Sequence, residues 1–221
     1  MFNEAGPYYT SYPVLGQWRE DTTGEAYANE LREFLTGTPD APLHLYLHIP
    51  YCAKLCWYCL CNILISNNEE RIQKFVDQLV VEIHQLAKFF EINGIVPNFR
   101  ELHFGGGTPS HLKQNQIRQI LDAVGTLTDV LKLDELAMEV DPRTVDRSDL
   151  EQYADLGVNR ISFGIQDFDA RVQETINRVQ PYEMIESLLL PETRARFSSV
   201  NFDLLYGLPN QTLETLAETV R

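Results

Sequence analysis

The sequence predicts an α/β fold in which parallel strands alternate with covering helices. Five short apolar segments are each followed by a segment with helical periodicity, the pattern of repeated βα units. The expected strands are residues 43–49, 100–104, 135–140, 158–165 and 199–205. Cysteines, glycines and carboxylates gather where these strands end. Since the loops after parallel strands open on one edge of a barrel or sheet, we expect one shared site there.

The first expected element is a helix at residues 25–35, which ends before Gly37, Pro39 and Pro42. We expect an N-terminal arm at residues 1–41 and one core domain at 42–221. The arm contains the string YTSYP at residues 9–13, whose tyrosines either anchor the arm to the core or contact a substrate.

Each expected strand leads to a helix. The helix at residues 69–90 has apolar residues at helical spacing and ends before Gly94. The capping box Ser148-x-x-Glu151 marks the start of a helix after the third strand. Pro191 predicts that the fourth helical region is short or broken. The other helices are expected at residues 114–127, 169–177 and 212–220.

Composition argues against several kinds of partner. Thirty-two acidic and 18 basic residues give a net charge of −14, which repels phosphate, so we expect neither nucleic acid nor an anionic membrane as partner. The sequence contains no apolar run of about 18 residues, the length that spans a bilayer, and its N-terminus lacks a signal-peptide pattern. We expect a cytoplasmic protein and a monomer.

All four cysteines lie in the stretch YCAKLCWYCLCN, residues 51–62. Four sulfurs within ten residues form one local site rather than a distributed disulfide framework. A zinc site, a redox pair and surface thiols without a role are alternatives, although zinc usually takes ligand pairs from separate turns. A short loop of thiolates favours an iron–sulfur cluster, whose nuclearity the spacing leaves open. The cysteines are Cys52, Cys56, Cys59 and Cys61.

Other candidate groups follow the later strands. The run GGGTP at residues 105–109 allows a ligand to approach the backbone closely, or is a plain flexible turn. Glu139, at the end region of the third strand, can accept hydrogen bonds from ribose hydroxyls or is an ordinary surface acid. Arg178 and Asp203 either contribute to the site or form a structural ion pair.

The spacing C-x3-C-x2-C after an apolar strand resembles the radical SAM superfamily. The flanking string HIPYCAKLCWYCLCN resembles the oxygen-independent coproporphyrinogen III oxidase (coproporphyrinogen dehydrogenase) family within it. The resemblance favours a partial (β/α)6-type radical SAM barrel, truncated after about five βα units, over an eight-unit barrel or an open sheet. It implies that Cys52, Cys56 and Cys59 bind a 4Fe-4S cluster and that Cys61 does not.

The resemblance also implies a site for S-adenosylmethionine (SAM), possibly for two molecules, beside the cluster. The GGTP, EVDP, FGIQDF, INRVQ and NFDLLYGLP strings match family motifs around this cofactor. The implied cofactor-binding residues are Tyr46, Tyr58, Gly106, Gly107, Thr108, Glu139, Gln166, Arg178 and Asp203. Asp141 is a further candidate, His48 is expected to be a histidine with its hydrogen bonds satisfied, and Tyr58 lies beside the adenine or packs the loop. No catalytic residue is assigned.

The implied reaction belongs to anaerobic porphyrin and heme biosynthesis. A 5′-deoxyadenosyl radical takes a hydrogen from a propionate of coproporphyrinogen III, and two oxidative decarboxylations give the two vinyls of protoporphyrinogen IX. A flavodoxin or ferredoxin is the expected electron donor. A related heme chaperone, a heme-opening methyltransferase and an inactive cluster-binding fragment are alternatives, and Cys61 argues against the first two. Leu60 replaces the glycine common in this family, and no sixth strand is present.

Overall fold

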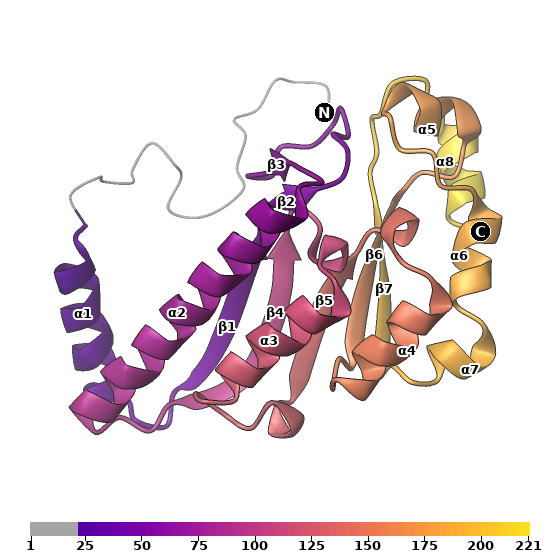
Figure 1. Ribbon diagram of the computed structural model, residues 1–221. Helices are drawn as coiled ribbons and strands as arrows, with labels where there is room; N and C mark the ends of the chain where they lie inside the picture. The colour runs from indigo at the N-terminus through magenta and orange to yellow at the C-terminus, as the bar shows by residue number, and fades with distance from the viewer. Residues whose placement is uncertain (1–21) are drawn as a thin grey trace.

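A computed structural model describes residues 22–221, and its centre is one parallel sheet in the order β1-β4-β5-β6-β7. Because successive strands are added on the same side, every crossover runs in one direction and the helices cover one face. Figure 1 shows α2, α3 and α4 packed across that face. The predicted α/β fold of repeated βα units is confirmed. The strands are β1 (Pro42–Ile49), β4 (Asn98–Gly106), β5 (Glu135–Val140), β6 (Arg160–Gln166) and β7 (Ser199–Leu204).

The helices agree with the predicted positions, with shifted ends. They are α1 (Gly24–Gly37), α2 (Glu69–Asn93), α3 (Gln114–Val124), α4 (Arg147–Asp155), α5 (Ala170–Thr175), α6 (Tyr182–Leu188), α7 (Pro191–Arg194) and α8 (Leu213–Thr219). The segment between β6 and β7 is broken into three short helices, as Pro191 predicted. That proline begins α7, where the N–H that proline lacks has no helical partner to lose.

Two predicted boundaries are wrong. The capping box of α4 lies two residues earlier than Ser148 and Glu151, because the Asp146 carboxylate accepts from the Asp149 N–H at 3.0 Å and the Asp149 carboxylate accepts from the Asp146 N–H at 2.9 Å. Strand β4 extends beyond the predicted residue 104 and includes two of the three glycines, which pair with β1 through Gly106.

The strands alternate between an apolar and a polar face. The apolar face packs under the helices, and its side chains are at most 1% exposed at Leu102, Phe104, Met138, Ile161 and Phe163. These residues form one core with Val76 of α2, Ile117 of α3 and Leu150 of α4, among others. The opposite, polar face carries the side chains that alternate with the apolar ones, and it leads to the candidate site at the carboxyl ends of the strands.

Two predictions concern the chain outside the central sheet. The YTSYP string at residues 9–13 lies outside the described residues, and the division into arm and core domain stays a prediction. Among residues 22–221, no helix is both long and apolar enough to cross a bilayer.

Candidate functional site

The cysteine loop is closed at its base by a two-stranded parallel sheet that the sequence did not predict. Strands β2 (Tyr51–Cys52) and β3 (Leu64–Ile65) pair here, and the Ser66 N–H donates to the Cys52 carbonyl at 3.1 Å. The far side of the loop is tied to the α5–α6 region, because the Trp57 N–H donates to the Ile176 carbonyl at 3.1 Å. The loop is therefore held both at its base and on its far side.

A cavity of about 250 Å³ opens between this loop and the carboxyl ends of the strands. Every predicted site residue except Tyr46 lines it, and all four cysteines do. The predicted residues on its wall are Cys52, Cys56, Tyr58, Cys59, Gly106, Gly107, Thr108, Glu139, Gln166, Arg178 and Asp203. The structure thus brings together residues that are up to 151 positions apart in the sequence, from Cys52 to Asp203.

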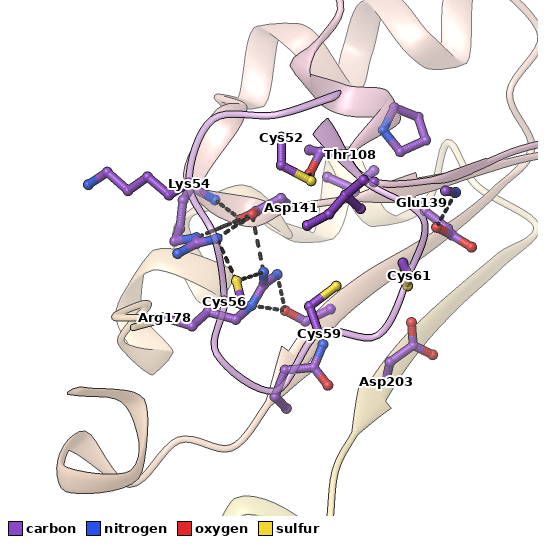
Figure 2. A pocket seen from close by; sticks show the side chains of 18 of the residues that line it. Cys52, Lys54, Cys56, Cys59, Cys61, Thr108, Glu139, Asp141, Arg178 and Asp203 are labelled. Carbon is purple, nitrogen blue, oxygen red and sulfur yellow. Dashed lines mark hydrogen bonds and ion pairs between the residues drawn. The ribbon is translucent and has the colours of Figure 1, made fainter. Parts of the chain in front are cut away.

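The four thiols occupy different environments. Cys52 and Cys56 are buried, Cys59 is half-buried and Cys61 is exposed. Figure 2 shows Cys52, Cys56 and Cys59 around a common space, with Cys61 on the side of Glu139 and Asp203. No three His, Cys, Asp or Glu side chains within residues 22–221 converge enough to hold a single metal ion. The thiols instead surround a cavity, an arrangement that suits a larger group with several sulfur ligands.

Burial and neighbouring groups raise the pKa of two of these thiols. Burial raises the pKa of Cys52, although the Thr108 hydroxyl, which donates to its sulfur at 3.2 Å, acts in the opposite direction. Burial and then the neighbouring Cys59 raise the pKa of Cys61 to about 11. The pKa shifts therefore do not separate Cys61 from the proposed ligands, and its greater exposure does.

Glycine is required where the GGGTP run passes the cysteine loop. A Cβ at Gly107 would lie 2.8 Å from the Pro50 carbonyl oxygen and 2.9 Å from the Cys52 sulfur. Gly106 has a φ of 115°, which side chains other than glycine rarely adopt. The absence of side chains lets this backbone approach Cys52 and line the cavity, so the plain-turn interpretation of the run does not account for its packing.

Glu139 is held by groups from the neighbouring strand. Its carboxylate accepts from the Gly106 N–H at 3.2 Å and lies 3.3 Å from Nε2 of His103. Tyr46 stacks on His103 with ring centroids 5.7 Å apart, outside the cavity lining. Its hydroxyl lies 3.2 Å from Nδ1 of His48, whose Nε2 lies 2.9 Å from the Asn62 carbonyl oxygen. Both ring nitrogens of His48 thus have partners, as predicted, and Tyr46 packs against His103, which contacts Glu139.

Asp141 joins two arginines in the buried wall of the cavity. Its carboxylate accepts from Arg143 at 2.6 Å and from Arg178 at 3.2 Å. Burial favours the neutral acid, but the hydrogen bond from Arg143 and the charge of Arg178 outweigh it and hold the pKa of Asp141 below its ordinary 3.8. The predicted alternative of an Arg178–Asp203 ion pair is wrong, because Asp203 accepts instead from Ser162 at 3.0 Å and from Asn201 at 2.8 Å.

Gln166 and Arg178 approach each other at the end of β6. Gln166 is largely buried and has a φ of 68°, a strained conformation for a residue with a side chain. Both Nε and Nη2 of Arg178 donate to the Gly164 carbonyl, at 3.2 and 2.7 Å. A Cβ at Gly164 would lie 2.9 Å from the ends of both side chains, so this glycine makes room for them.

Tyr58 serves the packing role that was one of its two predicted roles. It packs against Val172, Ile176 and Leu208 in a small apolar cluster and also lines the cavity. Burial raises the pKa of its phenol above the ordinary value.

Sequence reasoning missed several residues of the cavity wall, among them Arg143, Ser162 and Gly164. The alternation of β6 carried a signal for two of them, because Ser162 and Gly164 flank the buried Phe163 and must face the opposite side of the sheet. Arg143 follows Asp141 by two residues, but its contacts depend on loops from three different parts of the chain.

Comparison with known proteins agrees with this geometry. The family model described as the radical SAM superfamily matches residues 46–221. The oxygen-independent coproporphyrinogen III oxidase of Pseudomonas aeruginosa is 37% identical over 221 residues, covering 99% of this chain and 47% of the relative. The corresponding protein of Escherichia coli K12 is 36% identical over 220 residues, covering 46% of its own length. The chain therefore spans about half the length of these relatives.

Solved structures give the same result. Coproporphyrinogen III oxidase from Escherichia coli, described as a radical SAM enzyme, superposes with a TM-score of 0.83 at 37% identity, covering 96% of this chain and 47% of that one. The radical SAM methyltransferase TsrM from Kitasatospora setae shares the fold, with a TM-score of 0.53 at 18% identity over 80% of this chain and 33% of its own. The match over most of the chain shows that it belongs to the radical SAM superfamily.

Proposed function

We propose that this chain binds a 4Fe-4S cluster through Cys52, Cys56 and Cys59 and binds SAM beside it. We further propose that it is the core of an oxygen-independent coproporphyrinogen III dehydrogenase. The observation that carries the proposal is that three cysteines of one loop share a cavity with Gly106 and Glu139. The identity to coproporphyrinogen III oxidases over nearly the whole chain supports the choice of reaction.

The residues present fit both groups. Thiolates are the usual ligands of iron–sulfur clusters, and three of them leave one iron for another ligand. The glycine backbone beside Cys52 leaves space for the methionyl part of SAM, and the Glu139 carboxylate can accept hydrogen bonds from ribose hydroxyls. Arg178, Gln166 and Asp203 line the same cavity and are proposed as further SAM contacts.

The cofactor pair supplies the one-electron chemistry when it is bound, starting from reductive cleavage of the carbon–sulfur bond of SAM. The protein's own contribution is to hold the thiols in place, to orient the bound groups and to exclude water. The closed cysteine loop fixes the thiols, and the buried Asp141–Arg178 pair forms a rigid, polar wall beside Cys56. Shielding from water follows from the burial of Cys52, Cys56 and Thr108.

The proposed substrate is coproporphyrinogen III, and the proposed electron donor is a flavodoxin or ferredoxin. Each turnover removes one hydrogen from a propionate, releases carbon dioxide and passes one electron to an acceptor, which leaves a vinyl group. Two turnovers convert the two propionates. We also propose that the protein is cytoplasmic and monomeric.

Anaerobic reconstitution with iron and sulfide tests the cluster assignment. We expect about four irons per chain in the wild type and in Cys61→Ala, and a loss of most of this iron in Cys52→Ala, Cys56→Ala and Cys59→Ala. Cys61→Ala is the matched control, because it removes a thiol from the same loop and the same cavity. Loss of the cluster from Cys61→Ala with retention in Cys59→Ala would show that the ligand set is wrong.

A product assay tests the reaction. Reduced, reconstituted protein is incubated with SAM and coproporphyrinogen III, and vinyl-bearing products are sought by chromatography with mass detection. Products that depend on SAM and disappear in Cys59→Ala support the proposal. Stable binding of added heme, together with an intact cluster and no vinyl product, would instead favour a heme chaperone.

A further inference from the structure

Cys56 differs from the other proposed ligands in receiving two guanidinium groups. Nη2 of Arg143 lies 3.5 Å from its sulfur, and Nη1 of Arg178 lies 3.4 Å from it, both within hydrogen-bonding distance for sulfur. Among the described residues, the side chain that donates to the Cys52 sulfur is the neutral hydroxyl of Thr108. In the described part of the chain, no arginine hydrogen bond to Cys59 is present. The positive charge is thus concentrated at one of the three thiols.

Arg143 is fixed in this position by contacts on three sides. Its Nε donates to both oxygens of Asp141, at 2.9 and 3.2 Å, and its Nη2 donates to the same carboxylate at 2.6 Å. Its Nη1 donates to the Asn177 carbonyl at 3.4 Å. The Asn177 side chain in turn donates to the Leu55 carbonyl of the cysteine loop at 2.7 Å. The guanidinium therefore bridges the loop after β5, the turn after α5 and the cysteine loop.

The local charges do not cancel. Two arginines face one carboxylate, so Asp141, Arg143 and Arg178 together carry one net positive charge next to Cys56. The side chains of Arg143, Arg178 and Asp141 are only 18%, 8% and 8% exposed, so water screens this charge weakly. Hydrogen bonds to ligand sulfurs, local charge and solvent exposure are the factors by which a protein sets the potential of an iron–sulfur cluster.

We propose that Arg143 is a positioning residue that raises the reduction potential of the cluster through Cys56, and so eases reduction of the cluster by its external electron donor. The charge and the N–H groups stabilise the reduced cluster, which carries more negative charge than the oxidised one. This inference rests on the proposed cluster ligands. It concerns a residue that sits at a sulfur, separate from those proposed to contact SAM.

The test is a redox titration of reconstituted protein in the absence of SAM, followed by electron paramagnetic resonance. The variants are Arg143→Gln, which removes the charge, and Arg143→Lys, which keeps the charge and loses the planar fork. We expect Arg143→Gln to lower the ratio of reduced to oxidised cluster about tenfold at a fixed applied potential, which is a shift of about 59 mV for one electron. Arg143→Lys should shift the ratio in the same direction by about twofold.

Arg147→Gln is the matched control. Arg147 lies four residues further along the chain, and among residues 22–221 it pairs with the carboxylates of the half-exposed Glu151 and the exposed Glu192. Its removal changes the net charge of the protein by the same amount, so it should leave the potential unchanged. An equal shift in this variant would mean that general charge, rather than the contact with Cys56, sets the potential.

The outcomes separate this inference from the proposed function. If the wild-type chain takes up no cluster, the proposed function itself is wrong. If Arg143→Gln carries the full complement of iron at the wild-type potential and binds SAM more weakly, then Arg143 contacts the cofactor, and the inference is overturned. If Arg143→Gln does not fold, Arg143→Lys decides the matter, because a wild-type potential in that variant also overturns it.

Discussion

The two faces of the central sheet are built from alternate residues of the same strands, yet one face forms the core and the other forms the candidate site. On β4, Phe104 is fully buried under the helices, while its neighbour His103 faces the other way, half-exposed, and touches Glu139. On β6, Phe163 is fully buried and Ser162 donates to Asp203. A shift of one residue in register would exchange the core and the site, so the apolar face fixes the geometry of the polar one.

The difference between the faces shows where stability and function reside. The apolar face is close-packed and gains its free energy from burial. The polar face leads to the cavity, and its side chains are held by hydrogen bonds to one another. Substitutions on the two faces should therefore separate loss of folding from loss of ligand binding.

The largest expected effect is on the apolar face. Phe104→Ala should lower the free energy of unfolding by about 3–5 kcal/mol, because it leaves a cavity among fully buried neighbours. His103→Ala, one residue away on the other face, should cost only about 1 kcal/mol. Urea unfolding followed by circular dichroism measures both. Equal losses would show that the polar face also contributes to the core.

The next effect concerns the GGGTP run. Gly107→Ala should cost about 1–3 kcal/mol and reduce cluster content after reconstitution several-fold, because the new Cβ would overlap the Pro50 carbonyl and the Cys52 sulfur. Gly37→Ala is the control, since no atom lies within 4 Å of a Cβ added there. Iron analysis of both variants decides the point, and wild-type iron content in Gly107→Ala would contradict the close approach.

A smaller effect is expected for Glu139→Gln, which keeps the shape and removes the charge. Its affinity for SAM should fall about tenfold, because hydrogen bonds to an ionised acceptor are stronger than those to a neutral one. Glu101→Gln is the control, on the same polar face but paired with His44 at 2.7 Å, away from the cavity lining. Equilibrium binding of SAM to reconstituted protein measures the difference. Equal affinities of the two variants would remove Glu139 from the proposed SAM contacts.

The smallest effect is a dependence on pH. Because the pKa of Asp141 is lowered in the folded state, its contribution to stability is fully present above its ordinary pKa of 3.8 and is lost as the pH falls through the lower, folded value. Urea unfolding of the apo protein between about pH 5 and about pH 2.5, on either side of the ordinary pKa of an aspartate, should show this loss. Asp141→Asn should lack that part of the pH dependence, whatever its overall stability. An unchanged dependence would assign the acid effect to other carboxyls.

Much of the fold was predictable because it depends on local patterns. The alternation of apolar residues placed all five strands, and helical periodicity placed the helices that cover them. Strands β2 and β3 have two residues each, which is too short to give a periodic pattern in the sequence. The start of α4 was misplaced because Asp146 and Ser148 are both acceptable caps, and only the structure distinguishes them.

The candidate site was predicted less evenly. The cysteines and Glu139 were predicted because each lies in a short sequence motif that indicates its chemistry. The partner of Arg178 was not, since Asp141 and Asp203 both lie at the ends of strands, and only their distances in space distinguish them. Arg143 was missed for the same reason, because Cys56 lies 87 positions before it in the chain.

The central claim is that Cys52, Cys56 and Cys59 hold a cluster with one iron left free to bind SAM. The most direct test is the electron paramagnetic resonance spectrum of the reduced, reconstituted chain before and after addition of SAM. We predict a spectrum that changes on addition of SAM in the wild type and in Cys61→Ala. A spectrum that stays the same at saturating SAM would contradict the claim.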